Sequence, residues 1–332
     1  MVEIRKENLP EHLKNRYDDL CFAFGVSEKS ILDEYEHNQR WVDYTMKLDE
    51  GIFELSASKL NAFDDSPFLL MDYITQKRET TKAMMLGRMR HKLILEYDLF
   101  FQEYLILPKD TKLNTLSSSE EFIGKIEFAQ YEKLAISLGI SEENIIGKSD
   151  FEDALLVKEL LYKYPETEKI LKRSVCSEKE INFEYSYNNY TFKFRGFIDK
   201  LLTNNAALEL KNINNIKWWQ NEIVDNNYLQ QAIIYLIWIY LQDISDEDHL
   251  LFTKEEISQK ASFNAVTKGE FYFLITAKKS AMSPVKISAE RLNFGLQQLH
   301  KNLDQIILCH RHGDWTKSKS YHSKKDSDFI IF

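Results

Sequence analysis

Three runs of alternating apolar and polar residues lie between Glu178 and Ile213. Two short turns separate the runs, and each turn contains a pair of asparagines, Asn188-Asn189 and Asn204-Asn205. Asparagine tolerates the positive φ angles that tight hairpins need, and alternation of this kind is typical of half-buried strands. The pattern therefore predicts a three-stranded antiparallel meander.

The lengths of the two turns determine which residues of the meander face each other. The first turn places Glu178 opposite Asp199, and the second places Asp199 opposite Glu209. Because side chains alternate along a strand, Lys211 shares the face of Glu209, whereas Leu210 points to the other face. Three carboxylates and one ammonium group then converge on one patch of sheet, provided that neither hairpin carries a bulge.

Patterns of longer period surround the meander. The apolar run within Tyr228–Gln242 predicts a buried helix, and Glu270–Thr276 predicts a further strand. Other expected elements are an amphipathic helix at Ser30–Leu48, two helices across Phe53–Tyr104, helices from about residue 123 to 171 with Asp153–Tyr164 strongly periodic, a strand at Val285–Ile287 and a helix at Glu290–Cys309. Strands interleaved with helices predict an α/β fold with a mixed central β-sheet flanked by helices. We expect a helical extension at 1–50 and a large α/β domain at 51–332.

The charged patch of the meander suits the chemistry of phosphodiester cleavage. Adjacent carboxylates repel each other unless a cation lies between them, and Mg²⁺ prefers one or two carboxylates together with water and phosphate oxygens. A neighbouring lysine can orient or deprotonate a water molecule and offset charge on phosphorus. The alternative is a solvated sheet face with ordinary cross-strand ion pairs, and the meander alone leaves this alternative open.

Two helical motifs provide further polar groups. Gln231 and Tyr235 are four residues apart, so they share one face of the predicted Tyr228–Gln242 helix. Upstream, Leu86-Gly87-Arg88-Met89-Arg90-His91 lies in a predicted helix and ends in a histidine. Such a histidine is ordinarily a packed or capping residue, but it can also bind a metal ion.

Together these motifs resemble a known superfamily of nucleases. Asp199 followed by Glu209-Leu210-Lys211 resembles the PD-(D/E)xK signature, and Gln231 with Tyr235 resembles the Gln-x-x-x-Tyr motif of RecB-like nucleases. The segment that ends at His91 resembles the Leu-Gly-x-x-x-His helix of phage-type exonucleases related to RecE. Softer matches are Ser58-Lys59-Leu60, Ser66-Pro67 and Gly313-Asp314-Trp315, so the resemblance covers roughly residues 55–316. Asn212 departs from it, because threonine is common after the motif lysine.

The resemblance implies a PD-(D/E)xK core and a set of site residues. Its metal ligands would be Asp199, Glu209, the Leu210 carbonyl and His91, and its catalytic residues would be Lys211, Glu178, Gln231 and Tyr235. Glu180 lies on the same predicted face as Glu178 and is its rival. The implied cofactor is Mg²⁺, for which Mn²⁺ would substitute.

The implied activity is resection of double-stranded DNA ends by an exonuclease acting in recombination. The implied partners are duplex DNA ends, a recombinase or single-strand annealing protein, and further copies of this chain in a homo-oligomer. An endonuclease or a single-strand nuclease of the same fold stays open, because loops decide specificity on a shared core. A catalytically silent module that binds DNA or protein also stays open as an alternative.

The chain of 332 residues has a net charge of −9, which does not favour a polyanion as a partner. Affinity for phosphate depends on local basic surface, however, and one stretch, 77–92, is strongly basic. We expect DNA contacts from Lys82, Arg88, Arg90 and Lys112. For any one of the basic residues in 77–92, a solvated helix face is an equally good interpretation.

Three scattered cysteines, with no Cys-x-x-Cys pair, favour a reducing cytoplasm and argue against a zinc site. The longest apolar run, Ala232–Leu241, is too short to span a bilayer, so we expect no membrane association.

Overall fold

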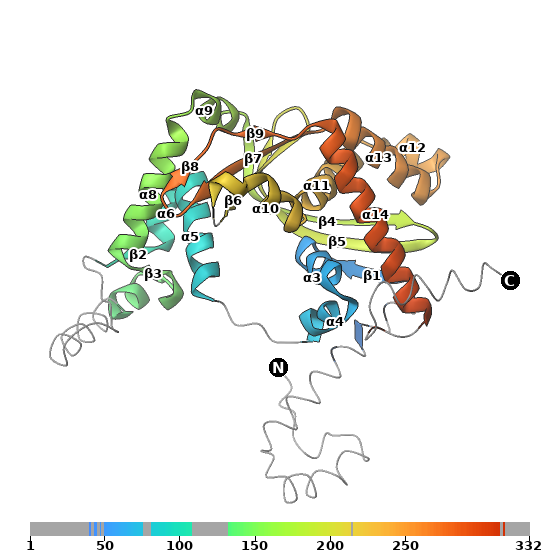
Figure 1. Ribbon diagram of the computed structural model, residues 1–332, viewed down its shortest axis with the longest axis horizontal. Helices are drawn as coiled ribbons and strands as arrows, with labels where there is room; N and C mark the ends of the chain where they lie inside the picture. Colours follow the sequence, from blue (N-terminus) through green and yellow to red (C-terminus); the bar gives the residue numbers. More distant parts are fainter. Residues whose placement is uncertain are drawn as a thin grey trace, which may run out of the picture. The chain divides into compact units, whose positions relative to one another are not determined.

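The structure is a computed structural model that describes residues 50–75, 81–107, 132–213 and 215–312, together with positions 40, 43, 44, 47 and 315 (Figure 1). The chain divides into two compact units. The first comprises 1–78, 190–192 and 302–332, and the second comprises 79–189 and 193–301. The predicted boundary at residue 50 stays a prediction, because residues 1–39 lie outside the described part of the chain.

The described part of the first unit contains a strand and helical segments. These are β1 (Ile52–Leu55), α3 (Ala57–Asp65), α4 (Pro67–Thr75) and the C-terminal part of α14 (Ala289–His312). The Ser56 side chain caps α3 by accepting a hydrogen bond from the Lys59 backbone N–H. The ring of Phe53 is fully buried and stacks on Phe192 at 4.9 Å. This aromatic contact joins β1 to the beginning of strand β5 (Tyr190–Leu202).

The second unit is built on a mixed β-sheet. Its strands are β4 (Ser174–Tyr187), β5 (Tyr190–Leu202), β6 (Ala206–Asn212), β7 (Glu270–Ala277), β8 (Ser280–Ala281) and β9 (Val285–Lys286). β4 pairs with β5, and β5 is antiparallel to β6. β6 is parallel to β7, which pairs antiparallel with β8 and β9. The predicted α/β class with a mixed central sheet is confirmed.

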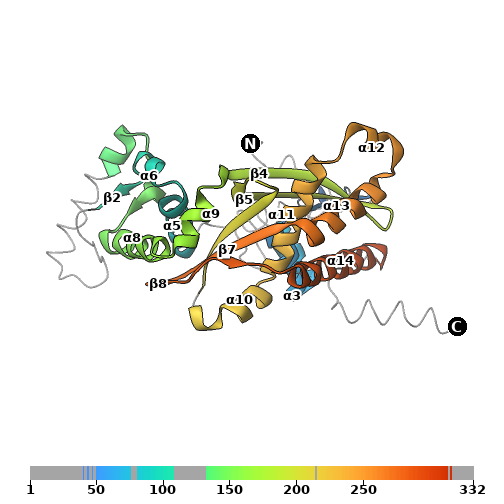
Figure 2. The ribbon, with the colours of Figure 1, turned by 90° about the horizontal axis from the view of Figure 1, so that it is seen from above.

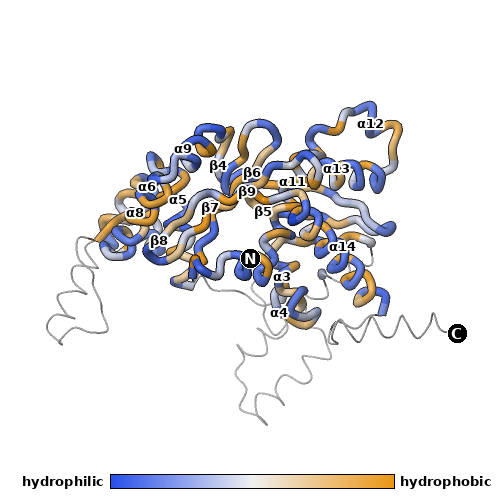
Figure 3. Tube along the Cα trace, turned by 45° about the horizontal axis from the view of Figure 1, so that its top comes forward, coloured by the Kyte–Doolittle hydropathy of each residue, from blue (hydrophilic) through white to orange (hydrophobic). Residues whose placement is uncertain are grey.

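Helices cover both faces of this sheet because each strand alternates its apolar side chains. Leu208 and Leu210 of β6 and Leu274 of β7 pack against α5 (Lys82–Leu95), α8 (Lys148–Tyr162) and α9 (Pro165–Leu171). On the opposite face of β7, the rings of Phe271 and Phe273 meet Tyr235 and Tyr228 of α11 (Tyr228–Gln242). α11 is apolar over most of its length (Figure 3), and α13 (Lys254–Lys268) packs beside it.

Shorter elements complete the second unit. They are α6 (Tyr97–Glu103), β2 (Leu105–Ile106), η2 (Glu142–Asn144), β3 (Ile145–Ile146), η3 (Ile216–Trp218), α10 (Trp219–Asp225) and α12 (Asp246–Leu251). β2 and β3 form a separate parallel pair. Figure 2 shows this pair with α5, α6 and α8 gathered at one end of the unit. Among the described helices, none combines the length and the apolar character needed to cross a membrane.

One sequence-based prediction of secondary structure was wrong. Two helices were expected across Phe53–Tyr104, but the segment contains β1, α3, α4, α5 and α6. The side chains of Ser56 and Thr81 each accept a hydrogen bond from a backbone N–H, so each begins a new helix. Capping residues therefore divide an apolar pattern that suggests longer helices.

The meander itself is confirmed, with one important departure. The register of the second hairpin is as predicted, with Lys200 opposite Leu208 and Leu202 opposite Ala206. In β4, however, Glu178 has φ of 47°, a left-handed conformation that interrupts a regular strand. This unusual backbone conformation occurs at a residue predicted to serve the site.

Candidate functional site

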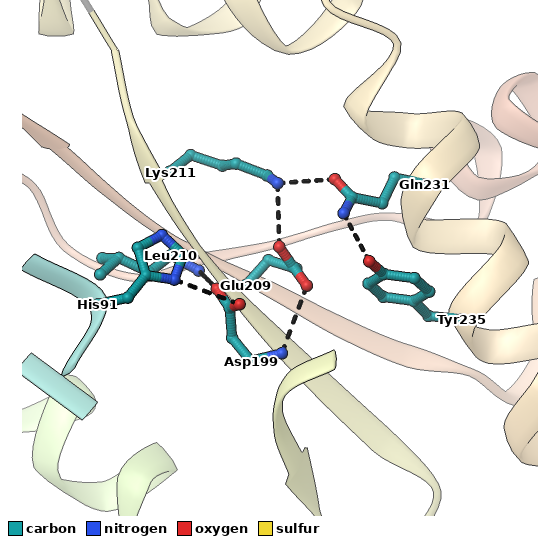
Figure 4. A network of polar contacts seen from close by, with 7 residues as sticks. All are labelled: His91, Asp199, Glu209, Leu210, Lys211, Gln231 and Tyr235. Atoms are coloured by element: carbon teal, nitrogen blue, oxygen red, sulfur yellow. Dashed lines mark hydrogen bonds and ion pairs between the residues drawn. The ribbon is translucent and has the colours of Figure 1, made fainter. Parts of the chain in front are cut away.

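The site lies in the second unit, where β5 and β6 stop pairing. Beyond the pair Lys200 and Leu208, the Leu210 backbone N–H donates to Asp199 Oδ2 at 2.7 Å (Figure 4). The Asp199 backbone N–H in turn faces Glu209 Oε1 at 3.4 Å. Carboxylates thus satisfy backbone donors that a continued β-ladder would pair with carbonyls. The two strands part around two acidic side chains.

Asp199 is one of three potential ligands that meet at this point. His91, on α5, brings its Nδ1 to 3.3 Å from Asp199 Oδ1. Ligand atoms of His91, Glu178 and Asp199 all lie within 4.8 Å of one another. The left-handed backbone of Glu178 therefore occurs where its carboxylate joins this cluster. Strained residues of this kind gather at functional sites.

A chain of hydrogen bonds runs from Glu209 to α11 (Figure 4). Lys211 Nζ donates to Glu209 Oε2 at 2.9 Å and to Gln231 Oε1 at 2.6 Å. Gln231 Nε2 donates to the Tyr235 hydroxyl at 2.7 Å. The ring of Tyr228 lies 4.6 Å from Lys211 Nζ. The ammonium group is therefore held on several sides, and the i, i+4 spacing on α11 aligns its two supporting residues.

The acidic groups of the site respond differently to burial. Burial, followed by the charge of Asp199, raises the pKa of Glu209 to about 7. Burial also raises the pKa of Glu178, with Asp199 again contributing. For Asp199 burial acts in the same direction, but the charges of His91 and Lys211 lower its pKa overall. Glu209 and Glu178 are therefore harder to ionise than Asp199.

The pKa values of both bases of the site are raised. Burial alone would lower the pKa of Lys211, but the charges of Glu209 and Asp199 raise it above its usual value. Burial likewise opposes protonation of His91, and Asp199 outweighs it, so this pKa is also raised. Without a bound cation, protons on these groups offset the carboxylates.

A divalent cation fits this cluster by its chemistry. Carboxylate oxygens with one imidazole nitrogen suit Mg²⁺ or Mn²⁺, and a cation between the carboxylates would offset their mutual repulsion. Among the predicted ligands, His91 and Asp199 belong to the cluster, whereas the Glu209 carboxylate contacts Lys211 and the Asp199 backbone instead. Glu178, predicted as catalytic, takes the third position, and exposed Glu180 lies outside it. Leu210 contributes a backbone N–H to Asp199.

Three of the predicted DNA-binding residues are engaged within the protein. Arg88 pairs with Glu143 at 2.9 Å, and Lys82 lies 3.8 Å from Asp150. Arg90 donates to Asn212 Oδ1 at 2.5 Å, which ties α5 to the end of β6. Lys112 lies outside the described residues.

Sequence reasoning missed a pocket that adjoins the cluster of His91, Glu178 and Asp199, which we call the cation cluster. The pocket has a volume of about 310 Å³ and is lined by Gly87, Arg88, His91, Lys92, Glu96, Glu103, Tyr104 and Glu178. Within it, Lys92 pairs with Glu96 at 2.8 Å and with Glu103 at 2.6 Å. The first of these pairs has i, i+4 spacing, which is a usable sequence signal. Nothing in the sequence indicates the second.

Comparison with known proteins does not assign this chain to a family. No family model matches it, and no curated protein matches its sequence. A crystal structure from Eubacterium rectale, of a protein named "Putative exonuclease", matches with a TM-score of 0.44 and 14% sequence identity. The match covers 79% of this chain and 82% of that chain. A likeness at this score does not by itself establish a common fold.

Proposed function

We propose that this protein is a divalent-cation-dependent nuclease that hydrolyses phosphodiester bonds in DNA. The proposal is supported chiefly by the cluster of His91, Glu178 and Asp199, whose ligand atoms lie within 4.8 Å of one another beside the partly buried Lys211. Beside the cluster, burial and the charge of Asp199 raise the pKa of Glu209 to about 7. A cation bound between the carboxylates would offset their mutual repulsion.

Each group has a definite part in this proposal. His91, Glu178 and Asp199 would hold the cation, which in such sites polarises a phosphoryl oxygen and lowers the pKa of water. Lys211 is charged and held by Glu209 and Gln231, so it stabilises negative charge that develops on the phosphate and orients the attacking water. Since its pKa is raised, this role is favoured over proton abstraction.

The finer assignments belong to the same proposal. We infer a PD-(D/E)xK core, because Asp199, Glu209 and Lys211 occupy adjacent strands of a mixed sheet and Gln231 meets Lys211 from a helix. Mg²⁺ is the proposed cation, with Mn²⁺ as a substitute. The proposed substrate is a duplex DNA end resected for recombination, and a recombinase or annealing protein would take up the product strand. A homo-oligomer and a cytoplasmic location are part of the proposal.

The decisive test is digestion of labelled linear duplex DNA and of the matched closed circle in Mg²⁺. Wild type is compared with Lys211→Ala and with Lys286→Ala, which removes a lysine from a different ion cluster on the same sheet. We expect loss of the linear duplex alone, abolished in Lys211→Ala and retained in Lys286→Ala.

Other outcomes would change the proposal in specific ways. Cutting of the circle would identify an endonuclease. Preference for a denatured sample of the same DNA would identify a single-strand nuclease. Absence of cleavage in both Mg²⁺ and Mn²⁺ would overturn the enzymatic proposal and leave a binding module on this fold.

A further inference from the structure

Strand β5 exposes an aromatic ring beside the cation cluster. Phe197 is 55% exposed, whereas Phe194 and Ile198 of the same strand are 1% and 0% exposed. Single exposed apolar side chains are ordinary on protein surfaces, so the exposure alone carries no argument. The position of Phe197 is informative, because Phe197 lies two residues before Asp199 and side chains at this spacing project to the same side of a strand.

A cationic side chain precedes this ring at the same spacing. Arg195 is exposed, and within the described part of the chain its guanidinium forms no hydrogen bond or ion pair. Arg88 and Lys82 differ from it, because both are paired with carboxylates. Arg195 therefore offers all of its donors to a ligand.

The order along β5 matches the parts of one nucleic-acid strand. Arg195, Phe197 and Asp199 follow one another at steps of two residues, which is roughly 6.7 Å along a strand. This step is similar to the distance between successive phosphates in an extended single strand. A guanidinium binds phosphate, an aromatic ring stacks on a base, and the carboxylate holds the cation that faces the scissile bond.

We propose that Arg195 and Phe197 form a subsite for an unpaired stretch of the substrate strand next to the cation cluster. Phe197 stacks on a base, which requires that the base has left its own helical stack, and Arg195 contacts a neighbouring phosphate. The strand that reaches the cluster is therefore single-stranded there, as a free single strand or as the frayed end of a duplex. Stacking accepts any base, so the subsite is not sequence-specific. This inference rests on the proposed nuclease function and specifies its substrate.

The test measures binding separately from cleavage. A short labelled oligothymidylate is titrated with protein and followed by fluorescence anisotropy, in EDTA and again with Ca²⁺ in place of Mg²⁺. The variants are Phe197→Ala, Phe197→Trp and Arg195→Gln. The matched control is Phe263→Ala, since Phe263 is 66% exposed on α13. Each variant is first checked for an unchanged melting temperature.

We expect Phe197→Ala to weaken binding about tenfold, within the range found for base–aromatic stacking. Phe197→Trp should retain affinity, and the added indole fluorescence should be quenched when the oligonucleotide binds. Arg195→Gln should lower the slope of log affinity against log salt by about 0.7. Phe263→Ala should bind like wild type.

The outcomes separate this inference from the proposed function. If DNA is cleaved but Phe197→Ala binds oligothymidylate like wild type, the subsite is overturned and the nuclease stands. If binding depends on Phe197 but nothing is cleaved in Mg²⁺ or Mn²⁺, the subsite stands and the nuclease is overturned. If wild type binds no oligothymidylate in EDTA or in Ca²⁺, the subsite is overturned.

Discussion

Two ion clusters occupy opposite ends of the parallel strands β6 and β7, and both contain a glutamate and a lysine. At the end of β6, Lys211 pairs with Glu209. At the start of β7, Glu270 accepts hydrogen bonds from Arg173 at 2.9 Å and from Lys286 at 2.5 Å. The glutamate side chains differ in exposure, at 3% for Glu209 and 30% for Glu270.

The two glutamates also differ in the direction of their pKa shifts. The hydrogen bond from Lys286 is the largest contribution to a lowered pKa at Glu270, and Arg173 adds to it. Burial and the charge of Asp199 raise the pKa of Glu209 to about 7. The Glu270 cluster has two cationic side chains for one carboxylate, so it is complete without a ligand. In the Glu209 cluster, the carboxylates of Glu178 and Asp199 lie close to Glu209, and this crowding of carboxylates distinguishes a candidate cation site from a structural ion cluster.

The largest expected contrast comes from neutralising one carboxylate in each cluster. Asp199→Asn should reduce DNA cleavage at least about 10³-fold, because a cation ligand is lost and several kcal/mol of charge stabilisation go with it. Glu270→Gln should leave cleavage unchanged and lower the free energy of unfolding by about 1 kcal/mol, since its partners are partly exposed. Initial rates and denaturant unfolding measure both. Equal losses of cleavage would mean that the two clusters do not differ in kind.

Replacing the lysine of each cluster tests the same contrast from the positive side. Lys211→Met should lower the turnover number about 10²-fold, a typical loss when one charge-stabilising donor is removed. Lys286→Met removes a lysine that is 54% exposed, so turnover should stay at the wild-type value. Steady-state kinetics on a labelled duplex would measure both turnover numbers. A normal turnover number in Lys211→Met would show that Lys211 takes no part in the chemistry.

The raised pKa of Glu209 predicts that cation affinity depends on pH. A protonated carboxyl does not attract a cation, so Mg²⁺ affinity should rise as pH increases through about 7 and fall as pH decreases below it. If binding of Mg²⁺ displaces one proton, the Mg²⁺ affinity should fall about tenfold for each pH unit below that range. Glu270 cannot produce this dependence, because its lowered pKa keeps it ionised throughout that range. Calorimetric titration at pH 6, 7 and 8 would show a constant affinity if no proton is displaced.

The smallest expected contrast involves one hydroxyl in each cluster. Tyr235→Phe removes the acceptor of the Gln231 amide, which should lower cleavage a few-fold and stability by about 1 kcal/mol. Tyr272→Phe removes a hydroxyl that lies 3.3 Å from both Arg173 and Glu270, and cleavage should not change. A larger loss of cleavage in Tyr272→Phe than in Tyr235→Phe would reverse the roles assigned to the two clusters.

Local periodicity was sufficient to predict how β6 and α11 present their polar side chains. Alternation along β6 separates Glu209 and Lys211 from Leu208 and Leu210, and the structure has that arrangement. The helix Tyr228–Gln242 was predicted with its observed bounds, because a long apolar run gives a strong signal. The spacing of Gln231 and Tyr235 then determined that they contact each other.

Features that depend on distant contacts could not be predicted. β1 has four residues, and Gly51 just before it accepts a hydrogen bond from Thr191, which is far away in sequence. The pairing of Arg88 with Glu143 likewise joins separate elements, so no local pattern indicates that this arginine is engaged. The left-handed Glu178 went unforeseen because glutamate has no preference for that conformation.

That conformation of Glu178 implies a conflict between durability and activity in this protein. A non-glycine residue in the left-handed region costs about 1 kcal/mol or more, and glycine or asparagine would occupy it with less strain. Selection for thermal stability alone would therefore favour Glu178→Gly or Glu178→Asn. Either change would remove a carboxylate from the cluster with His91 and Asp199. A stabilised variant obtained in this way should resist heat better and bind its cation less well, so screens for robustness in this protein need an activity assay alongside them.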